Sequence, residues 1–205
     1  MRAYKRYGKR GFTLVELMIV IAIIGVLAAL AIYGVRRYLA SAKTSEAKNT
    51  IGAIARGAKQ SYERETANSQ LIVNPNGGNS SGANHALCAT ATAVPATIPA
   101  GTKYQPGTGN GLDFDSGDSI TGWKCLKFTM TQAIYYRYSY TKGNSPVTSS
   151  HGGSPTVSGG ESFEAAAEGD LDGDNAPSAF ALVGQADAAN EMRVATQVYV
   201  FDEFE

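Results

Sequence analysis

The distribution of apolar residues divides the chain into a long helical segment and a body of strands and loops. From residue 12 to residue 35 the only formal charge is Glu16. At about 1.5 Å per residue this run forms a helix about 36 Å long, enough to cross the hydrocarbon core of a bilayer. Further on, apolar residues recur at spacings of three and four, the pattern of an amphipathic helix. They are Ile51, Ile54, Ala55, Ala58 and Tyr62. We predict one helix over about residues 13–66, apolar on all sides first and amphipathic later.

Alternation of apolar and polar residues predicts strands in the second half of the chain. Tyr136, Tyr138 and Tyr140 share one face of such a strand, which favours a half-buried strand over a surface for stacking ligands. The other predicted strands are residues 123–128, 162–168, 178–183 and 198–201. We expect an α+β fold in which an antiparallel sheet of four or more strands packs on the amphipathic half of the helix.

Three segments have the composition of loops. Residues 74–82 are rich in turn formers, and residues 85–111 read as an irregular connection between helix and sheet. Residues 143–160 are polar and of low complexity, so they are expected to stay outside the core.

The charge is unevenly placed although the net charge is zero. The first eleven residues hold five basic side chains and no acidic one, which leaves 13 basic against 18 acidic side chains in the remainder. A basic head before an apolar run is typical of a targeting or membrane-insertion segment. The acidic remainder predicts no specific nucleic-acid binding.

A removable secretory signal is one interpretation of the basic stretch and the apolar run, since Ala29-Leu30-Ala31 offers a cleavage site. The apolar run is longer than the usual 7–15 residues of such signals. A carboxylate near the centre of a membrane helix also costs about 2.5–3.5 kcal/mol, and less towards an end. Glu16 is therefore expected to have a partner. Cleavage between Gly11 and Phe12 would create one, an α-amine four residues before Glu16.

The stretch KRGFTLVELMIVIAIIGVLAALAI resembles the N-terminus of type IV pilins and of the pseudopilins of type II secretion. The resemblance implies that a prepilin peptidase cuts after Gly11 and methylates the amine of Phe12. It also implies that Glu16 pairs with the N-terminal amine of an adjacent subunit during assembly. Many family members have a proline where this chain has Tyr33, and that proline precedes a locally unwound helix in filaments.

The family pattern divides the chain into a basic leader (1–11), a transmembrane and assembly half-helix (12–35), an amphipathic half-helix (36–68) and a globular head (69–205). It implies a homopolymeric surface filament that serves adhesion, twitching motility or DNA uptake. The subunit would start in the inner membrane, with its leader cytoplasmic and its head periplasmic, and would reach the extracellular filament through an inner-membrane assembly platform. A pseudopilin, and more distantly an exported binding protein with an ordinary signal peptide, remain alternatives.

Two cysteines follow the apolar run. If that run exports the rest of the chain, Cys88 and Cys125 lie in an oxidising compartment and can form a disulfide. The alternative is a pair of buried free thiols.

One acidic motif suggests a metal. Asp170, Asp172 and Asp174 alternate in a turn, where their oxygens can be directed at a hard cation such as Ca²⁺. Glu161, Glu168 or Asp187 would complete the site, and an ordinary acidic β-turn is the alternative. The motif is no EF-hand, and no catalytic fingerprint occurs in the chain. We expect no enzymatic activity and no cofactor other than Ca²⁺.

The mature N-terminus distinguishes a pilin-type leader from an ordinary signal peptide. Mass spectrometry of the protein isolated from cells is expected to find N-methylated Phe12 as the first residue. A first residue near Ile32 would instead identify an ordinary signal peptide.

Overall fold

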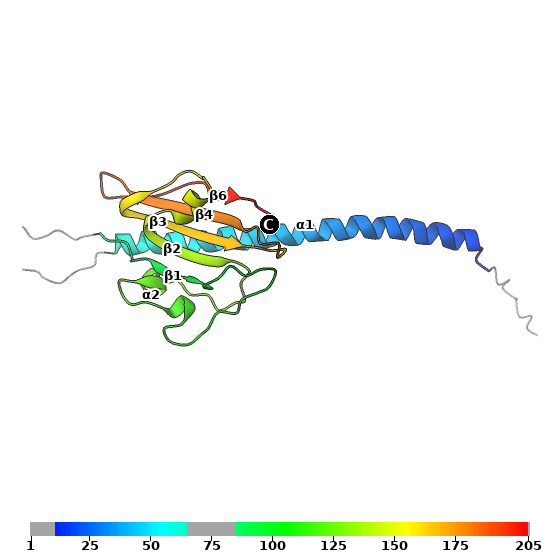
Figure 1. Ribbon diagram of the computed structural model, residues 1–205, viewed down its shortest axis with the longest axis horizontal. Coiled ribbons are helices and arrows are strands. Elements are labelled where there is room, and N and C mark those ends of the chain that lie inside the picture. The colour runs from blue at the N-terminus through cyan, green and yellow to red at the C-terminus, as the bar shows by residue number, and fades with distance from the viewer. Residues whose placement is uncertain (1–10, 65–84, 205) are drawn as a thin grey trace, which may run out of the picture. The chain divides into compact units, whose positions relative to one another are not determined.

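A computed structural model describes residues 11–64 and 85–204, which form two units that meet in sequence between Ser41 and Ala42. Nearly all of the predicted leader and the predicted loop at 74–82 lie outside the described residues. Helix α1 (Leu14–Glu63) belongs to both units (Figure 1). It confirms the prediction of one long N-terminal helix.

Helix α1 is uninterrupted at Tyr33 and Gly34. Proline at this point would lack a backbone N–H and would clash with the preceding turn. Tyr33 retains its N–H, and one glycine weakens a helix by only about 1 kcal/mol relative to alanine. The departure from the family pattern therefore leaves a continuous helix.

The second unit is built on one antiparallel sheet in which β1, β2, β3, β4 and β5 are neighbours in that order and β6 also pairs with β4 (Figure 1). This confirms the predicted α+β architecture. The strands are β1 (Ala91–Val94), β2 (Arg137–Asn144), β3 (Ser158–Gly169), β4 (Ser178–Ala186), β5 (Met192–Val194) and β6 (Tyr199–Phe201). The short helices are η1 (Asp113–Asp115), α2 (Gly122–Leu126) and α3 (Pro146–Ser150).

The main core lies between the sheet and the second half of α1, which runs behind the strands in Figure 1. Ile51 and Ile54 of α1 are fully buried there, as are the predicted tyrosines at 136, 138 and 140. Burial raises the pKa of all three tyrosine hydroxyls. The prediction that these tyrosines form a buried face, rather than a ligand surface, is confirmed.

Small residues on β3 make room for the tyrosine rings. Tyr138 pairs with Ala167 and Tyr140 with Ala165 in the β2–β3 ladder. A Cβ atom on Gly169 would lie 2.4 Å from the ring of Tyr136. The alanine-rich sequence of β3 is therefore a packing requirement of the neighbouring strand.

The predicted strand at 123–128 was wrong, because Gly122–Leu126 forms helix α2. Buried and exposed positions repeat there with a period of three, since Lys124 and Lys127 point to solvent between buried residues. This pattern is closer to the period of a helix than to the period of two that a strand requires. Lys127 adopts a left-handed conformation (φ 53°) and ends the helix.

The predicted loop at 143–160 was also only partly right, because it contains α3 and the start of β3. The carboxylate of Glu164, buried in β3, accepts the backbone N–H groups of Val147 and Thr148 at 2.9 Å each. Val147 packs with Ala166 and Ala179 in a second apolar cluster on the other side of the sheet. A polar segment thus covers this side because a buried carboxylate holds the first turn of α3.

Strands β1 and β5 lie where no strand was predicted, and both are very short. Strand β1 interrupts the predicted irregular connection at 85–111. Strand β5 pairs with one end of β4, while β6 pairs with the other end. The remaining predicted strands occur as β2, β3, β4 and β6, with shifted ends.

Helix α2 approaches α1 closely at Gly57. A Cβ atom on Gly57 would lie 2.7 Å from the backbone carbonyl oxygen of Leu126, which no side-chain movement can relieve. At Gly52, five residues earlier on the same helix, a Cβ would meet only the end of the Arg56 side chain at 3.6 Å.

Gly57→Ala is expected to destabilise the protein by about 1–2 kcal/mol. Overpacking costs about 1–3 kcal/mol and exceeds the gain of about 1 kcal/mol in helix propensity. Chemical unfolding followed by the fluorescence of Trp123, the only tryptophan, measures the change. Gly52→Ala is the matched control and should be neutral or stabilising; equal effects of the two variants would contradict the close approach at Gly57.

Candidate functional site

The residues predicted for processing and assembly lie at the start of α1. Thr13 is the residue before the helix, and Glu16 lies in the first turn. The Oε2 atom of Glu16 accepts the backbone N–H of Thr13 at 2.8 Å and its hydroxyl at 2.7 Å. In return, the hydroxyl oxygen of Thr13 accepts the N–H of Glu16 at 3.2 Å. This reciprocal arrangement is a capping box, which satisfies two N–H groups that a helix start leaves unpaired.

The capping box gives Glu16 a local role that our sequence prediction missed. The signal was present, since Thr13-Leu14-Val15-Glu16 has the T-x-x-E spacing of this motif. The predicted pairing of Glu16 with an α-amine across subunits stays a prediction. Gly11 and Phe12 precede the helix and are both exposed.

The apolar side chains of the helical segment after Glu16 are exposed. Every residue from 11 to 39 is exposed, including Leu27 and Leu30 at 59% and 66%. This is the one helix among the described residues that is long and apolar enough to cross a membrane. An apolar surface of this extent requires lipid or other protein as its neighbour.

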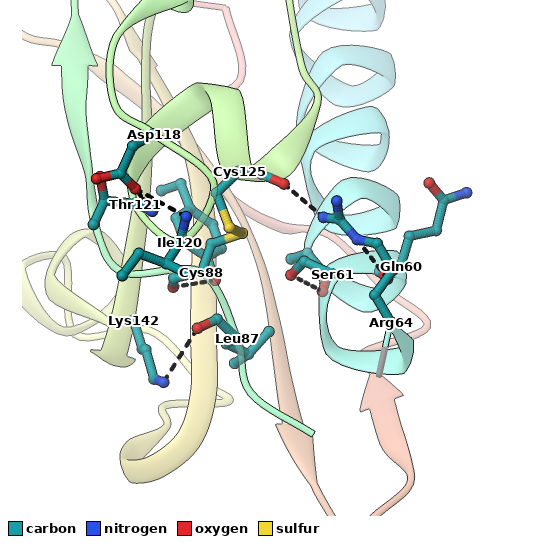
Figure 2. The surroundings of a disulfide bond; sticks show 12 residues. Gln60, Ser61, Arg64, Leu87, Cys88, Asp118, Ile120, Thr121, Cys125 and Lys142 are labelled. Atoms are coloured by element: carbon teal, nitrogen blue, oxygen red, sulfur yellow. Dashed lines mark hydrogen bonds between the residues drawn. A yellow bond between two sulfur atoms is a disulfide. The ribbon is translucent and has the colours of Figure 1, made fainter. Parts of the chain in front are cut away.

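The predicted disulfide between Cys88 and Cys125 is confirmed (Figure 2). It joins the segment before β1 to helix α2, with both residues buried and their Cα atoms 5.8 Å apart. The sequence separation is 37, and a closed loop of this size is worth about 3–4 kcal/mol in the chain-entropy model.

Both ends of the disulfide are also held by hydrogen bonds. A guanidinium N–H of Arg64 donates to the carbonyl oxygen of Cys125 at 2.6 Å, and Figure 2 shows this side chain reaching across from the end of α1. The hydroxyl of Tyr140 donates to the carbonyl oxygen of Cys88 at 3.1 Å. Nearby, the carboxylate of Asp118 accepts the backbone N–H groups of Ile120 and Thr121. Hydrogen bonding lowers the pKa of this carboxyl, and the bond from Ile120 has the largest effect. The disulfide is therefore tied by hydrogen bonds to the end of α1 and to β2.

The three aspartates of the acidic motif converge in the turn between β3 and β4. One carboxylate oxygen from each of Asp170, Asp172 and Asp174 lies within 4.8 Å of the other two. Asp170 is buried, and its two oxygens accept the N–H groups of Gly173 at 2.6 Å and Asn175 at 3.0 Å. The carboxylates thus shape the turn themselves, as the alternative interpretation expects. Calcium binding here stays a prediction.

The three acids proposed to complete that site have other partners. Within the described residues, the only acids grouped at metal-ligand distance are those of the turn itself. Each of the three acids proposed as further ligands forms an ion pair with a basic side chain. The pairs are Lys142–Glu161 at 2.7 Å, Arg137–Glu168, and Arg193–Asp187 at 2.6 Å. Any ligands beyond the three aspartates would be backbone or side-chain carbonyl oxygens or water.

Comparison with known proteins finds a known motif at the start of α1 and in the residues before it. Residues 6–32 match the family profile described as the prokaryotic N-terminal methylation motif. The chain carries this motif. It includes Gly11, Phe12 and Glu16, so the resemblance to type IV pilins inferred from these residues is confirmed.

The methylation motif also dominates the similarity to individual proteins. The chain is 58% identical over 45 residues to the type IV major pilin protein PilA of Myxococcus xanthus. It is 57% identical over 44 residues to the fimbrial protein EcpC of Eikenella corrodens, and 62% identical over 39 residues to a fimbrial protein of Moraxella nonliquefaciens. These matches cover 22%, 22% and 19% of this chain, but only 20%, 29% and 25% of the relatives. No solved structure matches the chain.

If the acidic turn binds calcium, the dissociation constant should be about 0.1–1 mM, as in extracellular modules. Asp172→Asn/Asp174→Asn removes two exposed carboxylates while keeping the buried Asp170, and should weaken binding at least about tenfold. Isothermal titration calorimetry of the full chain with CaCl₂ measures this. Asp202→Asn, an exposed acid outside the turn, is the control. Heat of binding that survives in the double variant would place calcium elsewhere.

Proposed function

We propose that the chain is a type IV pilin, the structural subunit of a surface filament assembled through α1. The observation that carries the proposal is the methylation motif joined to a helix whose apolar residues are all exposed as far as residue 39. The relatives are named as pilins and fimbrial proteins, which supports a structural role rather than an enzymatic one. The head, in which a sheet packs on a helix, can lie on the outside of such a polymer.

In this proposal a prepilin peptidase cuts after Gly11 and methylates the amine of Phe12. The peptide N–H of Thr13 survives the cut, so the capping box of Thr13 and Glu16 can persist. The box occupies one carboxylate oxygen of Glu16, Oε2. The other oxygen is left for the charged amine of the next subunit.

This pairing would select for correct register along the filament. Inside a bundle of apolar helices, an unpaired amine or carboxylate is strongly destabilising, by about 3–5 kcal/mol. A subunit that enters with its Glu16 beside the amine of its neighbour avoids that cost. Van der Waals packing between the apolar helices then contributes to association, because transfer from lipid to protein provides little hydrophobic driving force.

Before assembly the subunit would span the inner membrane, with the basic leader cytoplasmic and the head periplasmic. The disulfide in the head fits an oxidising compartment. Assembly would involve copies of the same chain and an inner-membrane platform, and the product would be an extracellular filament serving adhesion, motility or DNA uptake. A type II secretion pseudopilin is less favoured, because the similar proteins are named as pilins and fimbrial proteins.

Glu16→Ala is expected to leave a processed, membrane-inserted subunit that rarely enters filaments. The physical reason is the unpaired amine that each added subunit would then bury. Electron microscopy of cells and immunoblots of sheared filaments measure assembly, while blots of membranes measure processing.

Two further variants separate pairing from helix capping. Thr13→Val removes the capping hydroxyl, at a cost of about 1 kcal/mol, but keeps the carboxylate, so filaments should persist. Glu46→Ala removes an exposed glutamate further along α1 and should also assemble. If Thr13→Val lost filaments as completely as Glu16→Ala, capping would explain the effect and the pairing proposal would be wrong.

A further inference from the structure

Basic and aromatic residues gather on one face of α1 just after its apolar run. Tyr33, Arg36 and Arg37 stand at positions i, i+3 and i+4, which are neighbours on a helix surface. All three are exposed, and Tyr33 is 68% exposed. They belong to the unit that ends at Ser41.

The spacing between Glu16 and Arg36 equals the thickness of a bilayer core. Twenty residues of continuous helix separate them, and at about 1.5 Å per residue they lie about 30 Å apart. When the guanidinium groups reach the headgroups of one leaflet, Glu16 lies at the opposite interface rather than in hydrocarbon. The cost of a carboxylate falls steeply towards the end of a membrane helix.

The chemistry of the three side chains matches a phospholipid headgroup. A guanidinium group binds phosphate through two parallel N–H bonds and remains charged at any physiological pH. Tyrosine is enriched at membrane interfaces, where its ring lies among apolar groups and its hydroxyl reaches water. Positive charge on the far side of a membrane helix from its basic leader opposes the usual charge rule. An anionic lipid would offset that disadvantage.

We propose that Tyr33, Arg36 and Arg37 bind anionic phospholipid headgroups in the leaflet that faces the head. The inference rests on the proposed function, because it requires α1 to span the inner membrane before assembly. The bound headgroups hold the subunit at one depth and keep Glu16 at the leader-side interface. Extraction into a filament must release these lipids.

Native mass spectrometry of the processed full chain tests the proposal. The protein is held in micelles with equal amounts of phosphatidylglycerol and phosphatidylcholine at physiological ionic strength. Two arginines near a membrane surface contribute about 1 kcal/mol each, so about 25-fold enrichment of phosphatidylglycerol is expected. Arg36→Gln/Arg37→Gln should reduce the ratio of the two lipids to near one.

Two variants make the result specific. Arg56→Gln removes an exposed arginine from the same helix outside the apolar run and should leave the enrichment unchanged. Arg36→Lys/Arg37→Lys keeps both positive charges, and because both lipids carry a phosphate it should retain most of the enrichment. An unchanged ratio in the double glutamine variant, or an equal loss in Arg56→Gln, would overturn the proposal.

The outcomes also separate this inference from the proposed function. If the wild-type chain inserts into bilayers and forms filaments but shows no lipid preference, the lipid proposal alone is wrong. If the processed chain can be extracted from membranes by alkaline carbonate, both proposals fail, because α1 then does not span the bilayer.

Discussion

Packing of the second half of α1 against the tyrosine face of the sheet is the interaction on which the second unit depends. It buries Ile51 and Ile54 in the same core as the aromatic side chains of β2 and of the residue just before it. Burial of each such aliphatic side chain contributes about 1.5–3 kcal/mol to folding. The size of the tyrosines then dictates alanine and glycine on β3, since larger residues would meet the rings. The same constraint of close approach recurs at Gly57, where α2 contacts the helix.

Carboxylates that accept backbone N–H groups organise the points where chain segments begin or turn. Glu16 caps α1, Glu164 holds the first turn of α3, and Asp170 closes the turn between β3 and β4. In each case a charge-assisted hydrogen bond satisfies donors that regular structure leaves unpaired. A carboxylate of this kind can combine a structural role with a second one, and Glu16 is the residue where our proposal requires both.

The two halves of α1 place opposite demands on one continuous helix. The first half exposes apolar side chains, with Glu16 as its one charge, and requires lipid or other subunits, whereas the second half has a dedicated sheet to cover it. The basic and aromatic residues at 33, 36 and 37 lie where these demands change. Their proposed lipid contacts and the capping of Glu16 would define the two interfaces of the membrane-bound subunit.

The sequence by itself determined the long helix, its division into apolar and amphipathic halves, the buried tyrosine face, the disulfide pair and the methylation motif. These features are local or periodic, or follow from compartment chemistry, so they can be read without knowledge of distant contacts. Only the tertiary structure decided that residues 122–126 form a helix, because six residues are too few for an apolar pattern to separate helix from strand. It also decided that the polar segment around α3 covers the sheet, since that depends on the buried Glu164 seventeen residues beyond Val147. Likewise, Glu161, Glu168 and Asp187 pair with arginine and lysine because strand register and chain folding, not spacing along the chain, set their neighbours.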